Sequence, residues 1–152
     1  MKKKPEMTPC MLFKAEESVG YLLARSRAKL AKSLDIDLSQ HDITHAQGSI
    51  VLMLASGKYT TATDLARELY IDSASMTRMV DRLEKRGLLE RVPSIEDRRV
   101  TYLKLTVDGY ALAARLPPVY VGVLERNFAG FQEAELKTLK TLLRKYLDSE
   151  VS

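Results

Sequence analysis

The chain has 152 residues, of which 45% are hydrophobic and 29% are charged, and its formal net charge is +4. These values exclude an intrinsically disordered chain, which needs few apolar residues and unbalanced charge, and they indicate one globular domain. The single cysteine, Cys10, excludes a disulfide within the chain and a zinc site built from several cysteines. No apolar run is long enough to span a membrane, and no apolar core follows Lys2–Lys4 as in a signal peptide. We therefore expect a cytoplasmic protein without membrane contact.

The positive charge is unevenly distributed along the chain. Residues 1–32 carry eight basic and three acidic side chains, residues 78–104 carry eight and five, and residues 105–152 carry six of each. The overall excess is a weak signal, but a basic block in the middle of the chain favours an anionic partner.

The amino-terminal part of the chain has the apolar spacing of two helices. The first runs from about Cys10 to Leu34 and ends at Asp35-Ile36-Asp37, a poor helix-forming stretch. The second begins with a capping box formed by Thr44 and Gln47 and ends at about Gly57. Its apolar residues lie nearly all round the helix, which predicts a buried position.

Two short helices follow closely and form a helix-turn-helix candidate. Thr60 or Thr61 caps the first helix, and Asp72 or Ser73 caps the second, which Gly87 ends. The expected inward positions are Leu65, Ala66, Leu69, Met76, Val80 and Leu83.

The pattern beyond Gly87 changes from helical to strand-like. Residues 88–92 and 100–105 are rich in β-branched and large apolar side chains, and residues 93–99 between them are polar and turn-prone. This predicts a hairpin directly after the helix-turn-helix, which is a winged-helix arrangement. Thr106 then caps a helix that Pro117-Pro118 breaks or kinks and that continues to about Phe128. A last amphipathic helix after Gly130 carries Leu136, Leu139, Leu142, Leu143, Tyr146 and Leu147.

A winged helix can place its second helix in the major groove of DNA and its hairpin tip in the adjacent minor groove. Arg78 is the candidate for a bidentate contact to guanine, and Arg82, one turn later, for a phosphate contact. The outward residues of this helix are Ser73, Ser75, Thr77, Arg78 and Arg82, while Glu84 and Lys85 are expected to be merely solvated.

The hairpin tip contains an Asp-x-Arg spacing that suits the minor groove. Asp97 is expected to pair with Arg99 and to fix its direction, which lowers the cost of ordering a long side chain. Arg99 is then the minor-groove probe and Arg98 a phosphate contact. A solvated charged face is the competing interpretation of these arginines.

Asp97-Arg98-Arg99 followed by Leu105-Thr106, after the sequence VDRLEKRGL at residues 80–88, resembles the signature of the MarR family of bacterial transcription regulators. The resemblance covers roughly residues 10–147 and is strengthened by the Thr44 helix start. The break at Leu116-Pro117-Pro118 and the helices after it resemble the EmrR-like multidrug-efflux branch.

The resemblance implies an obligate homodimer whose first and last helices interleave, and the long apolar stripes of those helices favour the same assembly. The expected fold is mainly α with a small β-hairpin: a winged helix-turn-helix on an all-helical dimerisation region built from both termini. Residues 1–43 form an arm and dimerisation helix, 44–105 the winged helix-turn-helix, and 106–152 the carboxy-terminal dimerisation helices, all in one compact domain.

The expected function is sequence-specific DNA binding, most simply by a dimeric repressor. Two-fold symmetry predicts a pseudo-palindromic operator with half-sites about 10 bp apart. A small phenolic or anionic aromatic ligand, held between the dimer helices and the DNA-binding lobe, would release the operator. Tyr21, Arg25 and His45 are the ligand candidates; packing of Tyr21 and an ion pair of Arg25 are the competing interpretations.

The remaining reactive groups support few other functions. His41 and His45 have metal-ligand spacing, but His41 precedes the helix start and no further ligand completes a set, so we expect neither metal nor cofactor. Cys10 offers an alternative, a redox-sensing regulator of the same fold, against the interpretation of a bystander thiol.

The chain lacks the motifs of a phosphate loop, a nucleophile elbow and a catalytic triad, so we do not expect an enzyme. Winged helices also serve as protein-binding modules.

Overall fold

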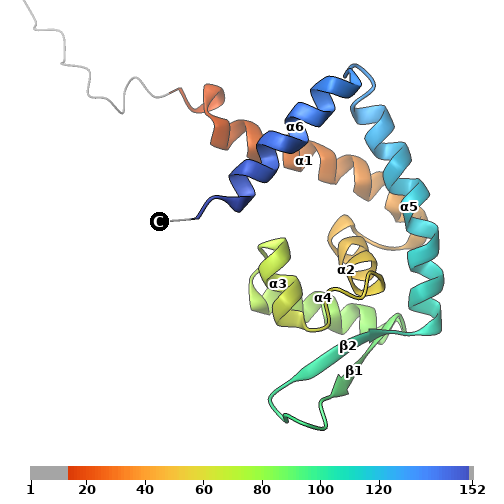
Figure 1. The fold of residues 1–152 in the computed structure, drawn as a ribbon. Coiled ribbons are helices and arrows are strands. Elements are labelled where there is room, and N and C mark those ends of the chain that lie inside the picture. The colour runs from red at the N-terminus through yellow and green to blue at the C-terminus, as the bar shows by residue number, and fades with distance from the viewer. Residues whose placement is uncertain (1–13, 151–152) are drawn as a thin grey trace, which may run out of the picture.

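The computed structural model describes residues 14–150, and Figure 1 shows their path. The fold is mainly helical with one two-stranded antiparallel sheet, as the sequence predicted. The predicted start of the first helix near Cys10 lies outside the described residues. The elements in chain order are the 3-10 helix η2 (Ala15–Glu17), α1 (Val19–Leu38), the 3-10 helix η3 (Ser39–His41), α2 (His45–Ala55), α3 (Ala62–Leu69), α4 (Ser73–Lys85), β1 (Leu89–Pro93), β2 (Thr101–Leu105), α5 (Val107–Asn127) and α6 (Glu133–Asp148).

The first helix extends through the stretch at which the sequence predicted its end. Its last turn buries Leu34 and Leu38 in the core. The carboxylate of Asp35 accepts a hydrogen bond from the His45 backbone N–H at 2.7 Å and lies 2.9 Å from the His45 ring. These contacts with α2 supply a tertiary partner for a residue of poor helix propensity, and packing outweighs that propensity.

The hydrophobic core lies where α2, the helix-turn-helix, the base of the hairpin and α5 meet. The capping box of Thr44 and Gln47 starts α2 as predicted. Of the expected inward positions of the helix-turn-helix, Leu65, Met76, Val80 and Leu83 are buried, and Ala66 and Leu69 are partly buried against the core.

The hairpin is fixed at its base and projects away from the helices at its tip (Figure 1). Leu89 pairs with Leu105 and Pro93 with Thr101. The first strand is therefore shifted by one residue toward the tip relative to the prediction, and the second strand begins one residue later than predicted. At the base, Gly109 of α5 lies so close to the chain that a Cβ there would meet the Leu88 carbonyl oxygen at 2.0 Å. Only glycine fits this joint between wing and helix.

Helix α5 is continuous from Val107 to Asn127 and includes Pro117 and Pro118, so the predicted break does not occur. A proline within a helix removes one backbone hydrogen bond and crowds the preceding turn. Both prolines are exposed, whereas Leu116 and Val123 on either side are fully buried in the core. Packing on both sides of the prolines therefore holds the helix together.

The two terminal helices expose apolar side chains that the rest of residues 14–150 leaves uncovered. No residue of α6 is buried. Val19 on α1 is 73% exposed, and Tyr146 on α6 is 65% exposed. Within residues 14–150, every helix is too short or too polar to cross a membrane.

Candidate nucleic-acid interface

The start of α4 is held by a chain of polar side chains. The Asp72 carboxylate accepts hydrogen bonds from the backbone N–H and the hydroxyl of Ser75, both at 2.8 Å. These bonds lower the pKa of Asp72. The Ser75 hydroxyl in turn accepts from the Arg78 guanidinium at 3.0 Å. Ser75 was expected to point outward, but the structure turns its half-buried side chain to Asp72, where it orients Arg78.

The outer face of α4 presents the other predicted residues to solvent. Ser73, Thr77, Arg78 and Arg82 are all exposed. The Thr77 hydroxyl donates to the Ser73 carbonyl oxygen at 2.9 Å, which leaves its oxygen free to accept. Among the described residues, Arg82 has no ion pair or side-chain hydrogen bond, so its guanidinium is available to a partner.

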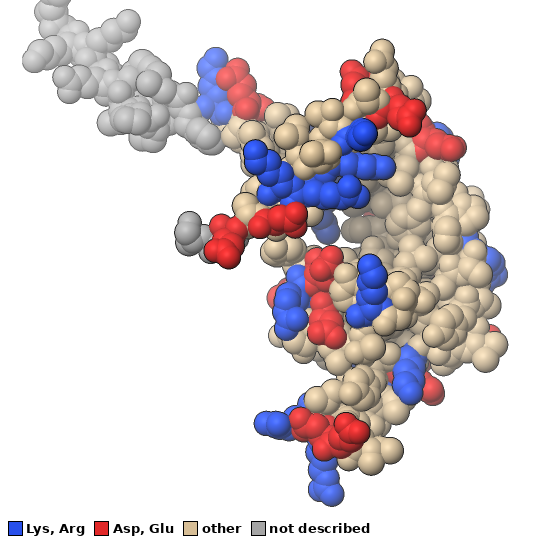
Figure 2. All heavy atoms as spheres, in the orientation of Figure 1, with Lys and Arg blue, Asp and Glu red and all other residues tan. Residues whose placement is uncertain are grey.

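The pairing predicted at the wing tip is present. Asp97 accepts from the Nε and Nη2 atoms of Arg99, each at 3.1 Å, and from its backbone N–H at 3.0 Å. These bonds lower the pKa of Asp97. The Arg99 side chain is 90% exposed, and Arg98 is exposed beside it. Figure 2 shows the tip, at the bottom of the view, as neighbouring basic and acidic side chains.

The hairpin is tied to α4 by a residue that sequence analysis missed. Arg91 of β1 donates to Asp81 at 2.6 Å and to Glu84 at 2.7 Å. The expectation that Glu84 is merely solvated was therefore wrong. The available signal was the pair of carboxylates one turn apart on α4, followed by an arginine in the first strand.

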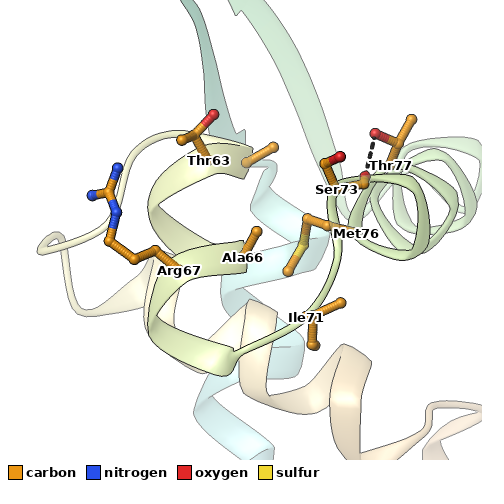
Figure 3. Close-up of a pocket in the computed structure, with 8 residues that line it drawn as sticks. Thr63, Ala66, Arg67, Ile71, Ser73, Met76 and Thr77 are labelled. Carbon is orange, nitrogen blue, oxygen red and sulfur yellow. Dashed lines mark hydrogen bonds between the residues drawn. The ribbon is translucent and has the colours of Figure 1, made fainter. Parts of the chain in front are cut away.

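A groove of about 390 Å³ runs between α3 and α4 beside the outer face (Figure 3). Ala66, Ile71 and Met76 form its apolar part. Ser73 and Thr77, on the α4 side, are predicted DNA contacts. Thr63 and Arg67, on the α3 side, were not singled out from the sequence, because nothing in the spacing of a short helix shows which polar residues flank its partner helix.

The three predicted ligand residues do not meet at one place in the chain. His45 is bonded to Asp35, and its carbonyl oxygen accepts from the Tyr120 hydroxyl at 3.3 Å, so it joins α1, α2 and α5. Tyr21 and Arg25 are exposed on α1. Their role as ligand contacts stays a prediction.

The other candidates from the sequence carry no site in the described part of the chain. His41 offers its carbonyl oxygen to Arg86 at 3.4 Å. Between residues 14 and 150, no three His, Cys, Asp or Glu side chains form a group that could hold a metal ion. Cys10 lies outside this range, so the redox hypothesis stays a prediction.

Helices α3 and α4 are followed directly by a hairpin whose tip carries the oriented Arg99. This arrangement defines a winged helix-turn-helix protein. A family model described as MarR family matches residues 43–101. The organic hydroperoxide resistance transcriptional regulator of Bacillus subtilis is 30% identical over 139 residues, which are 90% of this chain and 91% of the relative. The multiple antibiotic resistance protein MarR of Escherichia coli is 31% identical over 137 residues, 90% and 95% of the two chains.

Solved structures agree with these relatives. A cysteine-to-serine mutant of E. coli MarR complexed with operator DNA superimposes with a TM-score of 0.80 at 30% identity, covering 90% of this chain and 98% of that one. BpsR of Bordetella bronchiseptica gives a TM-score of 0.80 at 28% identity, covering 91% and 99%. The chain belongs to the MarR family of transcription regulators, and it is a regulator rather than an enzyme, as expected. These relatives do not distinguish the EmrR-like branch, which stays a prediction.

Proposed function

We propose that the chain is a dimeric repressor that binds a pseudo-palindromic operator and leaves it when a small phenolic or anionic aromatic ligand binds. The observation that carries DNA binding is the exposed Arg99, oriented by Asp97 on a hairpin next to the polar outer face of α4. An exposed arginine that is already oriented loses less conformational entropy when it enters a groove. The structure of the related E. coli MarR mutant with operator DNA supports the same partner.

The two grooves of DNA receive different parts of the lobe in this proposal. Helix α4 enters the major groove, where Arg78 contacts guanine and Ser73 and Thr77 contact base edges or phosphates. Arg82 and Arg98 contact phosphates. Arg99 enters the adjacent minor groove, which Asp97 itself does not need to touch.

The apolar faces that the terminal helices expose support the proposed dimer. Large side chains along α6 are exposed, and a second copy related by a two-fold axis would cover them together with the exposed residues of α1. The residues concerned are Val19, Tyr21, Leu22, Leu142, Leu143, Tyr146 and Leu147.

Release by a ligand is supported by two features. BpsR is described as a protein whose DNA binding is regulated by 6-hydroxynicotinic acid, a small aromatic acid. Figure 2 shows a hollow between the terminal helices and the winged-helix lobe, with basic side chains gathered along its upper edge. An anion bound there would change the spacing of the two α4 helices, so that they no longer fit successive major grooves.

The proposal is tested by a gel-shift titration with the DNA upstream of the protein's own gene, against unrelated DNA of equal length, at several salt concentrations. We expect specific binding at least about a thousandfold tighter than non-specific binding. Arg99→Ala should lose most of this preference, whereas Arg115→Ala, an exposed arginine of α5, should not. Equal affinity for both DNAs would contradict the proposal. Unchanged DNA binding by the Arg99→Ala variant would also contradict it and would favour a protein-binding module.

A further inference from the structure

Arg91 lies between two carboxylates of α4 and is bonded to both. Its Nη2 atom is 2.6 Å from Asp81 Oδ1, and its Nη1 atom is 2.7 Å from Glu84 Oε1. The second oxygen of Glu84 accepts from the Arg91 backbone N–H at 3.1 Å. Glu84 therefore holds the strand itself as well as the side chain.

The guanidinium of Arg91 is directed at the two carboxylates of α4. Its side chain is 31% exposed, and both of its terminal nitrogens already donate to carboxylates. Burial alone lowers the pKa of Arg91, but the hydrogen bonds to Asp81 and Glu84 outweigh it, so the pKa is raised. Two charge-assisted hydrogen bonds to separate carboxylates fix the direction of the guanidinium more strongly than a single exposed ion pair does.

Arg91 is also the outermost polar link between the hairpin and α4. At the same level, Leu103, which pairs with Arg91 across the hairpin, donates its backbone N–H to the Thr60 carbonyl oxygen at 2.8 Å. Nearer the base, the hairpin is held by buried Leu89. Among the described residues, no hydrogen bond or ion pair from residues 92–101 reaches α4. The tip that carries Arg99 therefore extends beyond its last anchor on the helix.

We propose that Arg91 is a positioning residue: by bridging Asp81 and Glu84 it fixes the wing on α4, so that Arg99 and Arg78 enter adjacent grooves together. This inference rests on the proposed function, because it assigns Arg91 a role in DNA binding without contact to DNA. The consequence is that Arg99 contributes to affinity only while the bridge is intact.

The test is a pair of double-mutant cycles on the full-length protein, with operator affinity measured at one salt concentration. Arg91→Met keeps most of the aliphatic stem and removes the bridge. We expect Arg99→Ala to weaken binding about ten- to a hundredfold in the wild-type background, but less than about threefold in the Arg91→Met background. Arg82→Ala is the matched control, since Arg82 lies on α4 itself, and should cost the same factor in both backgrounds.

Hydroxyl-radical footprinting supplies a readout that lost stability would not change. Arg91→Met should lose protection of the minor groove under the wing and keep protection of the major groove under α4. If Arg91→Met does not fold, the Asp81→Ala and Glu84→Ala double variant removes both acceptors of the bridge and is judged by the same cycle.

Additive losses for Arg91→Met and Arg99→Ala, with the minor-groove footprint retained, would overturn the positioning role. If Arg99→Ala has no effect even in the wild-type background, the proposed DNA-binding function fails instead. The two failures are therefore distinguishable in one experiment.

Discussion

Replacement of Asp97 by alanine tests whether the orientation of Arg99 matters for DNA binding. In the structure, Asp97 supplies the hydrogen-bond acceptors for the Nε, the Nη2 and the backbone N–H of Arg99. The wing tip keeps its other bonds without this carboxylate. The Ser94 hydroxyl oxygen accepts from the backbone N–H groups of Glu96 and Asp97, each at 3.2 Å, and the Val100 N–H donates to the Asp97 carbonyl oxygen at 3.0 Å.

The expected loss of DNA affinity follows from the conformational freedom that the Arg99 side chain regains in Asp97→Ala. Immobilising one long side chain on binding costs a factor of about 2 to 13 in Kd. A dimer uses two wings in one complex, so the factors multiply to about 5- to 150-fold. Loss of two carboxylates near phosphates opposes this effect, but exposed charges are screened at physiological salt, and we expect the net change to be a weaker complex.

Fluorescence anisotropy with a labelled operator measures the change in Kd, with Asp97→Asn as the control. Asparagine keeps an acceptor for the Arg99 backbone N–H and removes the charge. The Kd of Asp97→Asn should therefore lie between the Kd of the wild type and that of Asp97→Ala. Unchanged or tighter binding by Asp97→Ala, together with a large loss in Arg99→Ala, would refute the argument that the carboxylate orients the arginine.

Three further predictions concern stability, pH and assembly. Gly109→Ala should destabilise the fold by about 2 kcal/mol or more, measured by urea unfolding, because its Cβ would lie 2.0 Å from the Leu88 carbonyl oxygen. The pKa values of Asp72 and Asp97 are lowered from the ordinary 3.8, so their contributions to stability are complete above that pH and are lost only as the pH falls through the lowered values; thermal unfolding from about pH 8 to about pH 5 should show no loss due to them. Leu142→Glu should shift the dimer toward monomer in sedimentation equilibrium, because it places a charge on the exposed apolar face of α6.

Each of these predictions has a matched comparison. Gly20→Ala places a Cβ in open space within α1 and should be neutral or stabilising; equal losses at both glycines would contradict the steric argument. If the wild type lost stability between about pH 8 and pH 5 and the Asp97→Asn variant did not, the assigned direction of the Asp97 pKa shift would be wrong. Lys137→Glu, which helical spacing places on the side of α6 opposite its apolar face, should leave the sedimentation of the dimer unchanged. Dissociation by both α6 variants would show that the added negative charge, and not its place on the apolar face, causes the effect.

The sequence alone determined the elements whose causes are local. The caps at Thr44, Thr61 and Thr106 each bond to a backbone N–H three residues later, and the pairing of Asp97 with Arg99 spans two residues. Such contacts form wherever the backbone takes the expected turn, so a short window of sequence contains all the information they need. The inward positions of α4 follow from helical periodicity for the same reason.

Only the tertiary structure decided the features that depend on segments distant in the chain or on packing. The bond from His45 to Asp35 crosses ten residues, and it accompanies an α1 that continues past its predicted end. The core on both sides of Pro117 keeps α5 unbroken. The bridge from Arg91 to α4 exists because the strand folds back along that helix, a geometry that no local pattern encodes, since it depends on how the whole lobe packs.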